Sequence, residues 1–273
     1  MNALTSVVFS LGVIAYSVAM TLFFVDIARR TRRGPARRWA TRLLRIAALA
    51  HFAHIVVTSL ITGICPIYTV EFALSLTALV AVAGFLILGR SEPIHALGAF
   101  IAPLAITFLV GAQVVGGGYE AGQLSRGVLA VHVTASLLGA ASFLLAAGAG
   151  LFYLVAERRL KSKRLVAAGG KLPPLDVLDR VEHRFLLAGF PMLTLGIVTA
   201  AVFGTGGHVA DGKEVARSLL AYGSWGLVAM VLVLRTAAGW RGRKAAYGTL
   251  AGAIMMVMVL LVYLAGDRLG GLS

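Results

Sequence analysis

Long apolar runs constrain this chain more than any other feature of its sequence. A helix needs roughly 20 mostly apolar residues to cross the hydrocarbon core of a bilayer. Eight runs of about that length occur, at residues 4 to 26, 43 to 62, 70 to 89, 94 to 115, 128 to 156, 184 to 203, 218 to 237 and 246 to 266. Because 59% of the residues are apolar and only 13% are charged, the sequence predicts an all-α, polytopic membrane protein with about eight transmembrane helices.

Two charged segments set the expected domain organisation. Arg29 and Arg30 directly follow the first run, where a cleaved signal peptide would have small residues, so we expect a retained span. We expect one integral-membrane helical domain over residues 1–273. A basic cytoplasmic elbow is expected at residues 157–184, between the fifth and sixth runs, and Asp176 can cap a short amphipathic helix within it.

Basic residues are distributed unequally between the two sides of the predicted membrane. When the loops are assigned to alternate sides, one side has 21 of the 25 Lys and Arg residues, and the other has only Arg126, Lys213, Arg217 and Arg268. This asymmetry follows the positive-inside rule, so both termini are predicted on the outer, periplasmic side of a bacterial cytoplasmic (inner) membrane. The net charge of +14 therefore indicates contact with anionic lipid headgroups at the basic cytoplasmic loops, not binding of nucleic acid.

The sequence carries no arrangement of residues that is typical of an enzyme active site. Cys65 is the only cysteine, which excludes an internal disulfide, a C-x-x-C redox pair and a C-x-x-C-H haem attachment site. No Ser-His-Asp order and no paired carboxylates occur either. A role other than catalysis is therefore favoured.

Two histidines lie inside the second apolar run. His51 follows Arg45 by six residues, which places it near the middle of the membrane, and His54 lies on the same helical face. An ionisable group at that depth indicates a functional role, here as a ligand or in proton transfer. The alternative is that one or both side chains hydrogen-bond to Ser or Thr on a neighbouring helix, such as Thr58 or Thr77.

Further candidate ligands lie near the ends of the predicted helices. His132 begins the fifth run at the outer surface, where its imidazole could bind a metal or carry a proton, or could simply lie at the interface. His183 should lie at the opposite face of the membrane. His208 with Asp211, in a glycine-rich outer loop, could bind a divalent metal.

Several sequence segments resemble the integral-membrane cytochrome c assembly family of the CcsA and HemX type. They are LPPLDVLDR at 172–180, GFPMLTLGIV at 189–198, VHV at 131–133, ERRLK at 157–161 and GWRGRK at 239–244. The resemblance covers most of the chain after Gly63. The chain is divergent within the family because it lacks the tryptophan-rich WWD motif, although residues 211–214 resemble the segment that follows it.

This resemblance implies a protein that handles haem during cytochrome c biogenesis. Imidazole is a common axial ligand of haem iron, so His132 or His51 would bind the iron, with His54 also near the cofactor. His183, His208 and Asp211 are weaker candidates for haem contact. Expected partners are other cytochrome c assembly proteins or enzymes of haem biosynthesis.

Two other functions stay open at the level of sequence. One is a HemX-like regulator or scaffold of haem biosynthesis that need not carry haem, which the missing tryptophan-rich motif favours. The other is a small-molecule or proton-coupled transporter that uses His51, His54 and His183, although the inverted repeat typical of such proteins is not evident.

Overall fold

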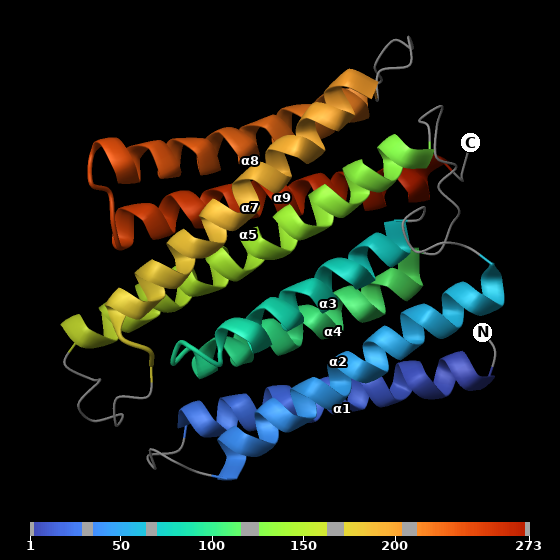
Figure 1. Cartoon of the computed structure of the whole chain (residues 1–273), viewed down its shortest axis with the longest axis horizontal. Coiled ribbons are helices and arrows are strands. Elements are labelled where there is room, and N and C mark those ends of the chain that lie inside the picture. The colour runs from blue at the N-terminus through green and yellow to red at the C-terminus, as the bar shows by residue number, and fades with distance from the viewer. Residues whose placement is uncertain are drawn as a thin grey trace. The chain divides into compact units, whose positions relative to one another are not determined.

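A computed structural model describes residues 3–28, 35–63, 70–115, 126–162, 172–203 and 212–270. These residues form eight α-helices and one 3₁₀ turn, with no strand among them (Figure 1). The elements are α1 (Ala3–Ala28), α2 (Pro35–Thr62), α3 (Val70–Leu88), η1 (His95–Leu97), α4 (Gly98–Val115), α5 (Arg126–Lys161), α7 (Leu175–Phe203), α8 (Gly212–Ala237) and α9 (Arg243–Gly270). The predicted all-α fold is confirmed.

Most of these helices are long and apolar enough to cross a membrane. Within the described residues six meet that standard, and the shorter helix Phe72–Leu88 is also apolar. The six are Ala3–Ile27, Ala36–Thr62, His95–Gln113, Val128–Lys161, Leu175–Val202 and Val215–Ala237. The chain is therefore a multi-pass membrane protein, whereas the outward orientation of its termini stays a prediction.

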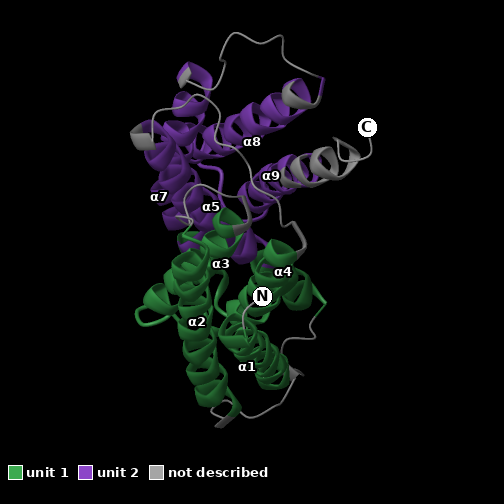
Figure 2. Ribbon diagram, turned by 90° about the vertical axis from the view of Figure 1, so that its right-hand side faces the viewer, with its two compact units in different colours: residues 1–121, 152–180 green, residues 122–151, 181–273 purple. Residues whose placement is uncertain are grey.

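The helices form two compact units, coloured in Figure 2. Unit 1 comprises residues 1–121 and 152–180, and unit 2 comprises residues 122–151 and 181–273. Helices α1 to α4 lie in unit 1, and most of α7 with all of α8 and α9 lies in unit 2. The prediction of one domain over residues 1–273 stays a prediction.

Three helices begin clearly earlier than the apolar runs predict: α2 at Pro35, α7 at Leu175 and α8 at Gly212. Because α5 continues to Lys161 and α7 begins at Leu175, both ends of the predicted elbow at 157–184 are helical. Ion pairs four residues apart extend these ends: Lys161 to Glu157 at 2.8 Å and Arg180 to Asp176 at 2.7 Å. Such pairs support exposed helical turns. Some of the charged residues in the elbow therefore lie on the surfaces of α5 and α7.

Close contact between α5 and α7 requires small residues. A Cβ atom added to Gly139 of α5 would lie 2.8 Å from the backbone nitrogen of Leu193, and one added to Gly189 of α7 would lie 2.9 Å from Cβ of Ser142. Small residues let helices in a membrane approach closely. This contact fixes the neighbours of His132.

Candidate functional site

His132 lies on α5 in unit 2, and one of its ring nitrogens is held by α7. Its Nδ1 atom is 2.9 Å from the carbonyl oxygen of Gly196 and 3.0 Å from Oγ1 of Thr199. The side chain is half-buried. Because the two acceptors come from the same part of α7, they fix both the position and the direction of the imidazole ring.

The hydrogen bonds also determine which nitrogen carries the proton. A carbonyl oxygen only accepts, so Nδ1 of His132 must be the donor to Gly196. The Thr199 hydroxyl donates to the carbonyl oxygens of Leu195 and Gly196, at 2.8 and 2.9 Å, so its oxygen accepts from His132. In the neutral ring, Nε2 then has the lone pair. No hydrogen bond to Nε2 occurs among the described residues.

The glycine at position 196 makes this geometry possible. A Cβ atom there would lie 2.5 Å from Oγ of Ser136, which is one turn along α5 from His132. A larger residue would require the Ser136 hydroxyl to turn away or α7 to shift, and a shift of α7 would lengthen the bond to Nδ1. The family-like segment GFPMLTLGIV thus contributes the backbone acceptor for His132.

An imidazole in this state is suited to binding iron in haem. Histidines that bind metals commonly donate their other ring N–H to a carbonyl, which sets the tautomer. A bare metal ion usually needs several protein ligands, and no group of three His, Cys, Asp or Glu side chains occurs within the described ranges. Haem iron, by contrast, takes only its axial ligands from protein. The donor set therefore fits haem better than a free ion.

His51 in unit 1 has a different environment. Its side chain is 0% exposed, with Nδ1 3.2 Å from the hydroxyl of Tyr16 and Nε2 2.7 Å from Oγ of Ser75. Both nitrogens are engaged, so neither is open to iron in this arrangement. The hydrogen-bonding alternative describes His51, because Ser75 is a serine on the neighbouring helix α3. The second partner, Tyr16, was not expected.

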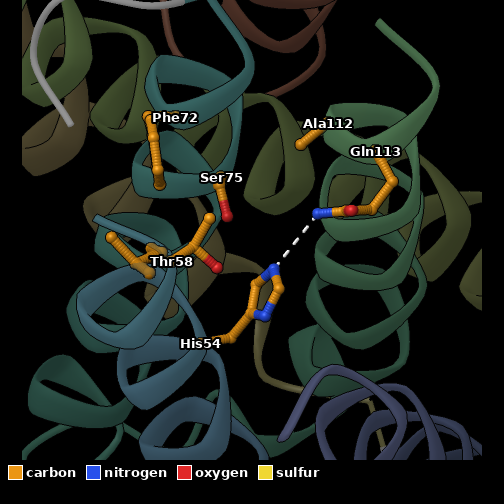
Figure 3. A pocket seen from close by; sticks show the side chains of 7 residues that line it. His54, Thr58, Phe72, Ser75, Ala112 and Gln113 are labelled. Carbon is orange, nitrogen blue, oxygen red and sulfur yellow. Dashed lines mark hydrogen bonds between the residues drawn. The ribbon is translucent and has the colours of Figure 1, made fainter. Parts of the chain in front are cut away.

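His54 lies beside a cavity of about 200 Å³ in unit 1 (Figure 3). Its Nε2 accepts from the side-chain amide of Gln113 at 3.1 Å. Pockets for drug-sized ligands have volumes of roughly 300 to 1,000 Å³, so this cavity is too small for a porphyrin. His51 and His54 therefore do not fit haem as they stand.

Of the remaining predicted ligands, only His183 lies within the described residues, and it is far from His132. His183 lies on α7 thirteen residues before Gly196, so it is roughly 20 Å away along the helix axis. His208 and Asp211 lie outside the described residues. The prediction that any of these residues contacts haem stays untested.

A buried charged group in unit 2 was missed by the sequence analysis. Glu182 on α7 is 0% exposed and accepts a hydrogen bond of 2.6 Å from Thr249 on α9. Arg235 on α8, with 5% of its side chain exposed, lies 3.8 Å from the second carboxylate oxygen. Glu182 lies four residues from Leu178 and from Leu186, both buried, so its place on an apolar helical face was a usable signal.

Comparison with known proteins decides the family. A profile described as "Cytochrome C assembly protein" matches residues 67–267 of the chain. The chain belongs to this family. The matched range includes His132 and all of α7, whereas His51 and His54 precede it. The family resemblance inferred from the sequence motifs is confirmed.

Similar family members are cytochrome c biogenesis proteins named CcsA. The protein of Synechococcus sp. (strain CC9605) is 24% identical over 286 residues, covering 95% of this chain and 92% of the relative. The protein of Crocosphaera subtropica is 28% identical over 123 residues, 45% of this chain and 36% of the relative. That of Synechocystis sp. is 28% identical over 116 residues. In the last two cases the match spans about a third of the relative's length, 36% and 34%.

Proposed function

We propose that this cytochrome c assembly protein handles haem in a bacterial cytoplasmic membrane, with His132 as a residue that would hold the haem iron. One observation carries the proposal: Nδ1 of His132 donates to the backbone of α7, which leaves the lone pair on Nε2. The family membership and the CcsA relatives support the same function.

The side chains around His132 would act by holding the ring. Gly196 and Thr199 accept a hydrogen bond from Nδ1, which keeps the ring in one tautomer and one orientation. Ser136 packs against Gly196 and sets the spacing of α5 and α7. Haem, when bound, would supply the iron and the redox chemistry, while these residues would orient the ligand without contacting the metal.

The proposed partners follow from charge and family. The basic ends of the helices, including Arg158, Arg159 and Arg184, would contact anionic headgroups on the cytoplasmic side. Other cytochrome c assembly proteins or haem-biosynthesis enzymes would supply or receive haem.

The test is haem binding by the full-length protein in detergent. We expect purified protein given haem to show a Soret band that His132→Ala removes and that free imidazole restores. His95→Ala serves as the matched control, because His95 lies in η1 of unit 1 and is not a candidate ligand, and it should leave the band unchanged.

Two results would contradict the proposal. One is a wild-type protein that stays colourless after haem is supplied, and the other is an unchanged band in His132→Ala. Co-purification of a haem-biosynthesis enzyme with a colourless protein would favour the regulator instead.

A further inference from the structure

The cavity in unit 1 is lined by polar groups although it lies between apolar helices. Its walls come from α2, α3 and α4 and comprise His54, Ile55, Thr58, Phe72, Ser75, Ala112 and Gln113. Figure 3 shows the Thr58 and Ser75 hydroxyls and the Gln113 amide directed towards a common space. No lining residue carries a formal charge when His54 is neutral, so the cavity suits a neutral, hydrogen-bonding occupant.

One of these polar groups lacks a partner within the described part of the chain. Oγ1 of Thr58 is buried and makes no hydrogen bond there. The other hydroxyls of α2 and α3 behave differently, since Thr62 donates to Thr58 O and Thr77 donates to Ala73 O, at 2.8 Å each. A buried hydroxyl without a partner is costly, so the free Thr58 hydroxyl points to a missing occupant of the cavity.

The size and position of the cavity indicate what that occupant is. Its volume of about 200 Å³ is small for an organic ligand but ample for several water molecules, each of which occupies roughly 30 Å³ in the liquid. Thr58, Phe72 and Gln113 all lie within a few residues of a helix end, where α2 and α4 stop and α3 begins. The cavity therefore lies near one end of these helices.

We propose that this cavity is a water-binding site, in which Thr58, Ser75 and Gln113 hold a small cluster of water molecules inside the apolar part of unit 1. Buried water typically makes two to four hydrogen bonds to polar groups, and these three side chains with His54 supply them. The cluster would also reach the Tyr16 and His51 pair, because Ser75 lines the cavity and is hydrogen-bonded to Nε2 of His51. A histidine that is 0% exposed would thus be one hydroxyl away from water.

Thiol reactivity tests the proposal, because a cysteine reacts as the thiolate and ionises readily only in contact with water. In a Cys65→Ser background of the full-length protein, Thr58→Cys and Ala112→Cys place thiols in the cavity wall. Leu60→Cys and Val110→Cys are the matched controls on α2 and α4, since Leu60 is 78% and Val110 38% exposed on the outer surfaces of the helices. The probe is a small, positively charged methanethiosulfonate applied to protein in lipid vesicles.

We expect the cavity thiols to react at least roughly tenfold faster than their controls. The comparison of Thr58 with Leu60 is the stricter one, because Leu60 is nearer the end of α2 and would react faster if depth alone mattered. Adding Ala112→Leu to the Thr58→Cys variant should fill the cavity and slow the reaction to the control rate. Equal rates at Thr58 and Leu60, or no effect of Ala112→Leu, would overturn the proposal. Haem binding at His132 does not enter this measurement, so the two proposals fail independently.

Discussion

His51 in unit 1 and His132 in unit 2 both lie in apolar helices, but their ring nitrogens are used differently. His51 has a hydroxyl partner on each nitrogen and is fully buried. His132 is half-buried, and within the described ranges only its Nδ1 is engaged. A histidine with hydrogen bonds at both ring nitrogens links neighbouring helices. A histidine with a hydrogen bond at one nitrogen keeps the other nitrogen as a potential ligand. A histidine in a membrane helix is therefore not a ligand by position alone.

The two units also differ in buried charge. The Tyr16, His51 and Ser75 network of unit 1 can form with every side chain neutral, whereas unit 2 buries a carboxylate on Glu182 beside Arg235. The following variants test these contrasts, in order of decreasing expected effect.

The largest effect is expected for Arg235→Met in unit 2. This change removes the positive charge beside a fully buried carboxylate, which typically costs about 3–5 kcal/mol of stability. Thermal unfolding in detergent should show a marked loss, which Glu182→Gln in the same chain should partly reverse. Arg180→Met, which removes an exposed ion pair, is the control and should leave the melting temperature unchanged. Similar melting temperatures for both arginine variants would contradict a stabilising role for Arg235.

Gly196→Ala should weaken both the fold and haem binding. The new Cβ atom would meet Oγ of Ser136, and overpacking of this kind costs typically about 1–3 kcal/mol. Relief of this clash by a shift of α7 would lengthen the bond from His132 to the Gly196 carbonyl, so the Soret band should weaken. The control is Gly226→Ala, where nothing lies within 4 Å of the added atom. Haem titration of both variants measures the difference. Equal haem affinities would contradict a role of Gly196 in positioning the His132 ring.

His51→Leu should destabilise unit 1 without affecting haem. The change leaves the hydroxyls of Tyr16 and Ser75 without the imidazole, and a buried group that loses its partner costs about 1–3 kcal/mol. The melting temperature should fall while the Soret band stays constant per mole of folded protein. A weaker Soret band in His51→Leu would contradict the inference that His132, and not His51, binds haem.

Thr199→Val should have the smallest effect. The variant removes one acceptor of Nδ1 but keeps the Gly196 carbonyl, so the tautomer of His132 is preserved. Changing a group that orients a metal ligand typically lowers affinity by roughly 10–100-fold, and we expect a loss near the lower limit. Thr107→Val, at an exposed position of α4, is the control in the same haem titration. A loss as large as that of His132→Ala would show that the hydroxyl, not the carbonyl, holds the ring.

The sequence predicted the helices well because apolar length is a local property. All eight runs correspond to helices, and the errors lie at helix ends such as Pro35 and Leu175, where charged or polar residues continue the helix. The motifs around His132 and α7 also identified the family, since they lie in the range that the family profile matches.

The hydrogen-bond partners could not be predicted because they are distant in sequence. Gly196 is 64 residues from His132, and Ser75 is 24 residues from His51. A local sequence pattern does not predict which residue of a neighbouring helix will hydrogen-bond to an imidazole. Glu182 differs, because its spacing from Leu178 and Leu186 was visible and was overlooked.

The hydrogen bonds from His132 to α7 restrict how a cofactor could bind to the imidazole. Two acceptors near one turn of a helix leave the ring little freedom to swivel, so the line from Nε2 outward has a set direction. A haem bound by His132 would therefore be held by α7 as well as by α5. Substitutions on α7 far from His132 could alter the direction of Nε2 by turning the helix.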